Sequence, residues 1–369
     1  MSRKQRAVII GACLVAVVVI VIAAVMARSD EGPPTPPPPP PPTGPVSHHV
    51  SWPIGETTVY ATITRPEGDG PYPAVVLVAG TGSFDRDWNA LHLPGDNGSG
   101  SLLAAELARQ DFVTIRHDKR YVGPGAAENI PHLLGRISLA SHVEEIAGAV
   151  ETLLAQAYVD PDRIYLLSHG EGAFHALNYH LQHGEPIAGL VLTGPPGRSM
   201  AELFVEQIAR QFEELPIVEE IVAGLEILIS DFLAGDPFEP HPDVPIALND
   251  MVSTWHAARN LPFMREILPL NPADLLPQAT VPTLVVIGRK DIQVDWQVDG
   301  ALLQAATAGL DNIAYHFPTN ANRVLKFEPK PREQLGEGDA FDYNAEGRVL
   351  DPETVLVIVS WLNEQSKAG

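Results

Sequence analysis

Residues Ile164–Leu177, IYLLSHGEGAFHAL, decide the fold of this chain. The first four, Ile164–Leu167, have the length and apolar character of a buried strand. The next five, Ser168–Gly172, are small or polar and include two glycines, which favours a tight turn. Because a helix is expected to begin at Ala173, the stretch predicts a strand, a sharp turn and a helix in immediate succession.

This layout is that of a nucleophile elbow, the G-x-S-x-G turn in which a central serine stands above the end of a strand. Gly170 takes the serine position, within S-H-G-E-G-A. A non-glycine residue in such a strained turn costs roughly 1–3 kcal/mol, and glycine removes that cost. The sequence therefore keeps the turn of the elbow without its nucleophile.

The stretch resembles the elbow of the α/β-hydrolase superfamily, in particular the serine-aminopeptidase-like and acyl-esterase-like branch, whose elbow usually reads G-H-S-E-G-G. Further segments resemble that branch, in addition to the acid segment described below. They are Gly80–Asp87 (GTGSFDRD), His117–Gly123 (HDKRYVG) and Asn320–Lys326 (NANRVLK). The resemblance spans about residues 57–362 and implies an α/β-hydrolase fold, with a doubly wound, mostly parallel sheet and an inserted helical cap.

The resemblance also implies an oxyanion hole. Gly80, Thr81 and Gly82 match the family loop that supplies one backbone N–H to it. The glycines allow main-chain amides to approach a developing oxyanion closely. Glu171 follows the nucleophile position, so its backbone N–H is the expected second donor.

The resemblance places the acid and the base of the triad near the C-terminus. Gly288–Val294 matches the segment that carries the acid, which makes Asp291 the retained acid position. Arg323 occupies the histidine position of N-A-N-H, and an arginine cannot act as a base because its pKa is above 12. We therefore expect an Asp291–Arg323 ion pair that fills the vacated site, with Glu171 as a second carboxylate within reach.

Loss of both nucleophile and base predicts a catalytically inactive protein, since removing either costs on the order of 10⁶ in turnover. Its pocket would bind an apolar or acyl-like ligand, or a protein partner. The competing hypothesis is an active esterase or peptidase whose nucleophile these motifs do not reveal. A third hypothesis, a purely structural surface scaffold, is not separable from the first by sequence.

Several other polar residues lie near the elbow or carry chemistry that could replace the lost groups. Ser168 lies on the strand side of the turn, and Ser83 lies in the oxyanion loop. His175 falls on the elbow helix, where a packed or capping role is the simpler interpretation. His241 and His256 lack the H-x-x-H or H-E-x-x-H spacing of a metal site. We therefore predict no metal site and no cofactor.

The rest of the domain alternates strands with helices. Thr57–Thr64, Ala74–Ala79, Phe112–Arg116 and Ile187–Thr193 have strand character, as do Thr283–Ile287 and Ile313–Phe317. Such alternation is typical of a doubly wound parallel sheet.

Residues from Arg198 to about Leu270 interrupt this alternation. Met200–Phe212, Pro216–Leu233 and Ala247–Glu266 are helical in period, with no strand between them. The superfamily inserts its helical cap at this position, and additional helical bulk is the alternative. The predicted boundaries are 51–197 for the first part of the core, 198–272 for the cap and 273–369 for the second part of the core.

The N-terminus has a different composition. Ala7–Ala27 is uncharged and apolar, and at about 1.5 Å per residue it is long enough to cross a ~30 Å hydrocarbon core. Residues 1–6 are basic, which places them in the cytoplasm by the positive-inside rule. The sequence predicts a single-pass membrane protein with an extracytoplasmic domain, and the alternative is a cleaved signal peptide and a secreted domain.

Residues 28–50 are expected to form a proline-rich stalk in extended polyproline II conformation. The whole chain has 24 basic and 46 acidic residues and a formal net charge of −22, which disfavours a nucleic acid partner. Cys13 is the only cysteine, so the domain beyond it forms no disulfide. The membrane, through the N-terminal helix, is therefore a predicted partner.

Overall fold

The computed structural model describes residues 44–182 and 187–368. The predicted basic end, the predicted membrane anchor and most of the predicted stalk fall on residues 1–43 and lie outside the described residues. Within the described part of the chain, no helix has the length and apolar character that a membrane crossing requires.

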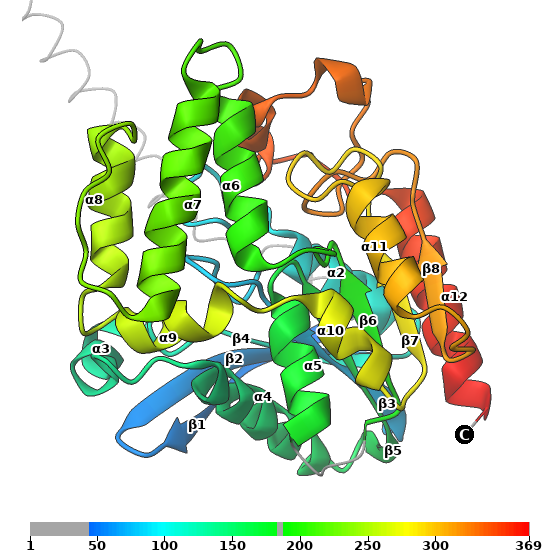
Figure 1. Ribbon diagram of the computed structural model, residues 1–369. Helices are drawn as coiled ribbons and strands as arrows, with labels where there is room; N and C mark the ends of the chain where they lie inside the picture. The colour runs from blue at the N-terminus through cyan, green and yellow to red at the C-terminus, as the bar shows by residue number, and fades with distance from the viewer. Residues whose placement is uncertain (1–43, 183–186, 369) are drawn as a thin grey trace, which may run out of the picture. The chain divides into compact units, whose positions relative to one another are not determined.

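A single eight-stranded sheet runs through the described residues in the order β1-β2-β4-β3-β5-β6-β7-β8 (Figure 1). All pairings from β4 to β8 are parallel, whereas β1–β2 and β2–β4 are antiparallel. The strands are β1 (Val46–Ile54), β2 (Thr57–Arg65), β3 (Tyr72–Val78), β4 (Val113–His117), β5 (Val159–His169), β6 (Gly189–Thr193), β7 (Thr283–Val286) and β8 (Ile313–His316). The predicted mostly parallel sheet is confirmed.

Helices cover both faces of this sheet. One layer contains α4, α5, α10 and α11, and the opposite layer contains α2 and α12 (Figure 1). The helices are α2 (Ser99–Arg109), α3 (Ala126–Leu133), α4 (Leu139–Leu154), α5 (Gly172–Gln182), α6 (Met200–Gln211), α7 (Val218–Ala234), α8 (Ile246–Trp255), α9 (Leu261–Ile267), α10 (Pro272–Leu275), α11 (Val298–Ala306) and α12 (Pro352–Ala368).

The central strands are apolar on both faces because both faces are covered. In β3, Val76 and Val78 belong to one hydrophobic core, and Val75 and Leu77 belong to the other. Successive side chains of a strand point to opposite faces, so a continuous apolar run fills both cores at once. This pattern is why the buried strands could be recognised in the sequence.

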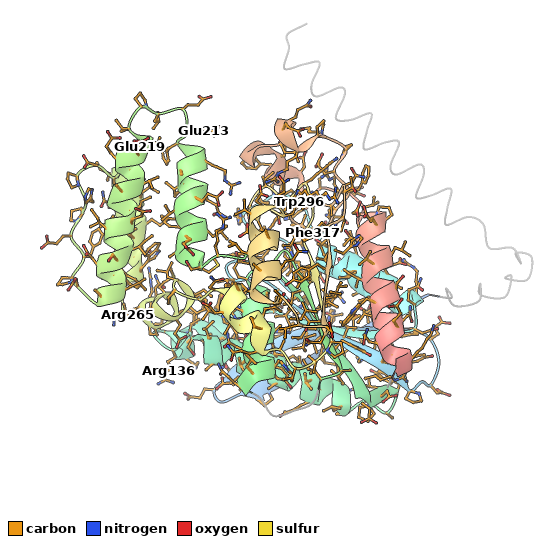
Figure 2. The ribbon with its side chains drawn as sticks, turned by 45° about the vertical axis from the view of Figure 1, so that its right-hand side comes forward. Arg136, Glu213, Glu219, Arg265, Trp296 and Phe317 are labelled. Carbon is orange, nitrogen blue, oxygen red and sulfur yellow. The ribbon has the colours of Figure 1, made fainter. Side chains whose placement is uncertain are left out.

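The helical segment predicted between the two parts of the core is present as α6 to α9. It has a small core of its own, in which Ile221, Leu225 and Phe232 of α7 pack with Val252 and Trp255 of α8. The turn between α6 and α7 lies near Glu213 and Glu219, at the end of these two helices that is remote from the sheet (Figure 2).

The third predicted helix of this segment, 247–266, is divided into α8 and α9. Pro262 lies in the first turn of α9. A proline lacks the N–H that a helix interior needs but fits the first turn of a new helix, so the break falls just before it.

The sheet begins earlier than predicted. β1 takes residues 46–50 from the predicted stalk and pairs antiparallel with β2 along its whole length, from Val46 opposite Arg65 to Ile54 opposite Thr57. Its polar residues disguise it in the sequence, but Val50 and Trp52 pack against the core. Exposed and partly buried residues alternate along most of β1, so one face of the strand is open to solvent and can carry polar side chains.

Candidate functional site

The elbow is built between β5 and α5. Gly170 has φ +58°, in the left-handed region, so the predicted glycine conformation is confirmed. Its backbone N–H donates to the Thr193 carbonyl of the neighbouring strand at 2.8 Å. Gly172 must also be small, because a Cβ there would lie 2.7 Å from the Val78 carbonyl oxygen.

The Arg323 guanidinium fills the space above Gly170. A Cβ built on Gly170 would overlap Nη2 of Arg323 and lie 3.3 Å from its Cζ. The same guanidinium borders Gly194, where a Cβ would lie 3.0 Å from Nη1. A serine at position 170 and the observed Arg323 conformation therefore exclude each other.

Arg323 is held by the retained acid. Its Nη1 donates to the Gly194 carbonyl at 2.9 Å and to Oδ2 of Asp291 at 3.3 Å. The predicted Asp291–Arg323 ion pair is thus confirmed, although a single nitrogen makes the contact and the second nitrogen lies toward Glu171. Asp291 is 1% exposed, and its other oxygen accepts from the backbone N–H groups of Gln293 and Val294.

Glu171 is the second carboxylate beside the guanidinium. Its Oε1 lies 3.7 Å from Nη2 of Arg323, and its side chain is 20% exposed. Burial alone would lower the pKa of the Arg323 guanidinium, but Asp291 and Glu171 outweigh burial and raise that pKa. The site therefore contains a cation that stays charged at physiological pH.

The predicted oxyanion loop lies against the elbow. A Cβ on Gly80 would be 2.9 Å from Oε2 of Glu171 and 3.7 Å from the Glu171 backbone nitrogen, so only glycine permits this approach. In the described part of the chain, neither the Thr81 N–H nor the Glu171 N–H donates to a protein acceptor. Gly82 is exposed at the outer end of the loop.

A family model described as serine aminopeptidase, S33, matches residues 98–316, which include Gly170 and Asp291. The chain belongs to this family. It is thereby a member of the α/β-hydrolase superfamily, as the sequence motifs predicted. The matched range ends before Arg323, so the exchange at the base position lies outside it.

A known esterase is similar to this chain in sequence. Esterase EstD of Thermotoga maritima is 24% identical over 312 residues, which are 81% of this chain and 64% of that esterase. The chain thus spans less than two thirds of the esterase.

Two solved structures are similar in fold. Proline iminopeptidase of Mycobacterium smegmatis gives a TM-score of 0.51 at 14% identity, over 87% of this chain and 99% of its own. A hypothetical protein of Pseudomonas aeruginosa gives 0.50 at 16% identity, over 88% of this chain and 95% of its own.

Behind the elbow, His169 has no access to the site. It is buried, stacks on Trp88 with ring centroids 5.2 Å apart, and lies 3.3 Å from the Thr193 hydroxyl. Burial, followed by the charge of Arg323, lowers the pKa of His169 well below its usual value. This imidazole is therefore neutral at physiological pH and packs as part of the core.

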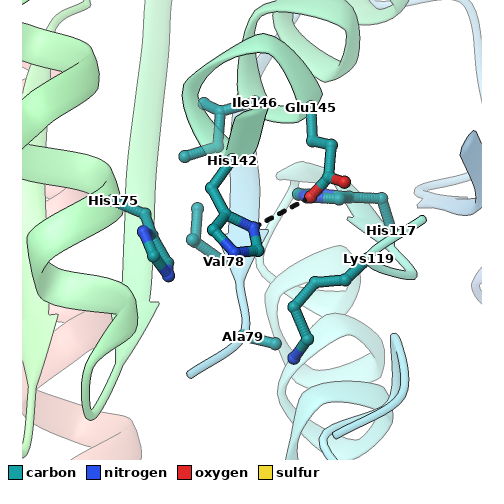
Figure 3. A pocket seen from close by; sticks show the side chains of 8 residues that line it. All are labelled: Val78, Ala79, His117, Lys119, His142, Glu145, Ile146 and His175. Carbon is teal, nitrogen blue, oxygen red and sulfur yellow. Dashed lines mark hydrogen bonds and ion pairs between the residues drawn. The ribbon is translucent and has the colours of Figure 1, made fainter. Parts of the chain in front are cut away.

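Behind the oxyanion loop lies a cluster of buried ionisable groups around a small cavity of about 10 Å³ (Figure 3). They are His117, Lys119, His142, Glu145 and His175, each 5% exposed or less. The cavity volume is close to the minimum that holds one water molecule. The helices α4 and α5, the last residue of β4 and the segment after it bring these residues together.

Four groups of this cluster contact another member or the loop. His142 Nδ1 lies 3.1 Å from Oε2 of Glu145, and the rings of His142 and His175 are 4.2 Å apart. Lys119 Nζ donates to the Gly80 carbonyl at 2.7 Å, and His175 Nε2 lies 3.5 Å from the Thr81 hydroxyl. The cluster thus contacts the oxyanion loop through Lys119 and His175.

Burial determines most of the charge states in this cluster. It lowers the pKa of His117 to about 4 and that of Lys119 to about 8, and it lowers the pKa of His175 well below its usual value. For Glu145, burial would raise the pKa, but the hydrogen bond from His142 and nearby positive charges lower it to about 2. Glu145 is therefore ionised, while His117 and His175 are neutral at pH 7.

The remaining candidates of the sequence do not join the site. Ser168 is fully buried, and its hydroxyl donates to the Val191 carbonyl at 3.4 Å. Ser83 is exposed. Among the described residues, no group of three or more His, Cys, Asp or Glu side chains could hold a metal ion, and this includes His241 and His256.

Three participants were missed by sequence reasoning. Gly194, whose carbonyl accepts from Arg323, gives no signal because a backbone carbonyl is common to every residue. His142 and Glu145 had a weak signal, an ionisable pair at i, i+3 on the buried face of an amphipathic helix.

Proposed function

We propose that this member of the serine aminopeptidase family is catalytically inactive at its elbow and binds the carboxylate end of an acyl-like ligand there. One observation carries the proposal: the Arg323 guanidinium occupies the space of the missing serine side chain. Acyl transfer needs a nucleophile that a neighbouring base activates, and these two positions hold a glycine and a permanent cation.

Other hydroxyl groups near the elbow lack an activating base. Ser168 is enclosed between strands, and the Ser83 hydroxyl has no imidazole or carboxylate partner among the described residues. Thr81 does lie 3.5 Å from His175 Nε2, but His175 Nδ1 is buried without a partner. No acid therefore orients this imidazole, as a triad requires.

The groups that remain suit a carboxylate. The free N–H groups of Thr81 and Glu171 would donate to one ligand oxygen, with Glu171 at the N-terminus of α5, where the helix dipole favours negative charge. Nη2 of Arg323 would donate to the other oxygen, as guanidinium groups commonly do. The partly exposed Glu171 carboxylate is the group that the ligand would displace from Arg323.

An activity screen tests the catalytic half of the proposal. The purified full chain is assayed with p-nitrophenyl esters of short and long acyl chains and with aminoacyl anilides, and turnover at the level of buffer is expected. Turnover that Thr81→Val or Ser83→Ala abolishes would instead identify an active hydrolase with an alternative nucleophile.

Calorimetry tests the binding half. Decanoate and decanol are titrated into the full chain and into the variant Arg323→Met/Asp291→Asn, which removes the ion pair without leaving a buried charge. We expect decanoate to bind the wild type at least about 10-fold more tightly than the variant, a difference of about 1.4 kcal/mol. Decanol should not discriminate. Equal decanoate affinity in both proteins would contradict the proposal.

We also propose that residues 7–27 anchor the chain in a membrane and leave the domain extracytoplasmic. Support comes only from the apolar run and the preceding basic residues. Carbonate extraction of membranes at high pH should leave the chain in the pellet. A mature protein in the medium that lacks these residues would instead indicate a cleaved signal peptide.

A further inference from the structure

The buried pair of histidines behind the elbow is joined to the loop that lines the proposed ligand site. His142 comes from α4 and His175 from α5, and their rings lie 4.2 Å apart with an interplanar angle of 36°. His175 Nε2 lies 3.5 Å from the Thr81 hydroxyl. We call His142 and His175 the imidazole pair.

The imidazole pair has unsatisfied hydrogen-bonding groups. Nε2 of His142 and Nδ1 of His175 are buried and have no partner among the described residues. A buried polar group without a partner costs roughly 1–3 kcal/mol, so such groups usually persist for a reason other than stability. Both rings border the cavity of about 10 Å³, which leaves room for small movements (Figure 3).

Burial opposes the uptake of a proton by His175, and the neighbouring His142, Lys119 and His117 add to this effect. The other ionisable groups around the cluster are Asp118 and Arg120 after β4, Glu145 on α4 and Glu171 at the start of α5, and their charges act on His117, Lys119 or Glu145. Asp85, in the loop that follows Thr81, also faces Lys119.

Two of the nearby carboxylates already have guanidinium partners. Arg120 donates from its backbone nitrogen and its Nε to Glu145, at 3.0 and 2.9 Å. Arg86 pairs with Asp118 at 2.5 Å. Lys119 supplies a positive charge, and its Nζ donates to the Gly80 carbonyl.

We propose that the imidazole pair is a proton-operated switch that holds the Gly80–Thr81 loop against the elbow while His175 is neutral and releases the loop when His175 takes up a proton. A proton on His175 converts Nε2 into a donor, so the Thr81 hydroxyl would have to reverse its role and accept across a contact that is already long, at 3.5 Å. It also places a positive charge beside Lys119 in a site with little water, where repulsion is strong. Outward movement of Thr81 relieves both effects.

This inference rests on the proposed function only in that the released loop lines the proposed ligand site. It concerns the conformation of the protein without ligand. A test without ligand therefore separates the failure of the switch from the failure of ligand binding.

Thiol labelling measures the release. Cys13→Ala removes the only thiol of the full chain, and Ala79→Cys then places one beneath the loop, where Ala79 is 7% exposed. Ser83→Cys in the same background is the exposed reference, and the ratio of the two labelling rates cancels the intrinsic effect of pH on the thiol. Circular dichroism at each pH verifies that the chain is folded.

We expect the normalised labelling rate to rise on the order of 10- to 30-fold between pH 7.5 and pH 5.0, as for an opening that frees one histidine of ordinary pKa. His175→Gln should abolish this rise. His180→Gln, on the same helix with a hydrogen bond to Thr280 away from the cluster, should retain it.

A normalised rate that is equal at both pH values would overturn the proposal, as would a full pH response in His175→Gln. If His175→Gln does not fold, Thr81→Val tests the same contact, because it removes the hydroxyl that faces His175. The valine keeps the size of threonine without the hydroxyl, so labelling should be fast at pH 7.5 and nearly independent of pH. An unchanged pH response in Thr81→Val would equally contradict the switch.

Discussion

The Arg323 guanidinium lies between two carboxylates and the Gly194 carbonyl, with only 6% of the residue exposed. A buried ion pair adds little net stability, because desolvation offsets the attraction. Removing one partner lowers the stability strongly, since the other partner is left charged in a site with little water. The stability of this region therefore depends on both members of the Asp291–Arg323 pair.

Arg323→Ala should destabilise the protein by about 3–5 kcal/mol, because it leaves the Asp291 carboxylate buried without a cation. Arg323→Met with Asp291→Asn should cost clearly less, since no charge remains. Urea unfolding of the three proteins measures the difference. A loss below about 1 kcal/mol for Arg323→Ala would contradict the importance that we assign to the pair.

The residue types at the site could be predicted from sequence, and their arrangement only in part. The motifs around Gly170, Asp291 and Arg323 indicated an ion pair. They also indicated that this pair would fill the vacated site, as the guanidinium does above Gly170. They did not indicate that a single nitrogen would make the contact with Asp291 while also donating to the Gly194 carbonyl, because this depends on one rotamer. The cluster around His142 was also missed, since its members come from separate elements whose packing no short motif encodes.

At the scale of elements, Arg198 joins the helical insertion to the core. Its Nε and Nη2 donate to the two oxygens of Asp299 on α11 at 2.9 and 2.8 Å, and Asp299 is fully buried. Arg210 of α6 also donates to the carbonyl of Ile292, in the loop that carries Asp291. The insertion thus contacts α11 through Arg198 and the acid loop through Arg210.

Arg198→Met should destabilise the protein by roughly 3 kcal/mol and speed proteolytic cleavage within α6 to α9, because Asp299 loses its buried partner. Arg109→Met is the matched control, since its pair with Glu106 is exposed and worth less than about 1 kcal/mol. Limited proteolysis and urea unfolding follow both effects. Equal behaviour of the two variants would show that Arg198 does not hold the insertion.

The elements themselves were predicted to different degrees. Central strands such as β3 and β6 were recognised because a sheet covered on both faces requires continuous apolar runs. The edge strand β1 was missed because its Ser and His residues face solvent. The short helix α3 and the helix α11 were also missed, and the division between α8 and α9 depended on Pro262.

At the scale of the whole molecule, buried neutral histidines link stability to pH. Burial lowers the pKa of His117 to about 4 and lowers those of His169 and His175 well below their usual values. The unfolded chain takes up protons below about pH 6.5, whereas folded His117 stays neutral until about pH 4. Stability is therefore complete above pH 6.5 and declines as the pH falls toward 4.

His117 alone should remove about 2–3 kcal/mol of stability between pH 7.5 and pH 4.5. Urea unfolding at the two pH values measures the loss. His117→Gln removes the titrating group, so this variant should lose less stability over the same range. An identical loss in wild type and His117→Gln would contradict the assignment of this effect to the buried imidazole.

Gly170 and Arg323 together determine whether the elbow can hold a hydroxyl group. A serine at position 170 meets the guanidinium of Arg323, and the replacement of Arg323 by histidine removes that contact. The backbone strain of a non-glycine residue at φ +58° is the same in both backgrounds, so it cancels from their comparison. The two positions should consequently couple in stability.

The decisive measurement is the free energy of unfolding of the wild type, Gly170→Ser, Arg323→His and the double variant. We predict that the double variant is more stable than the sum of the two single changes by at least about 1 kcal/mol. Single changes that add to within about 0.5 kcal/mol would contradict the conclusion that Arg323 occupies the place of the lost nucleophile.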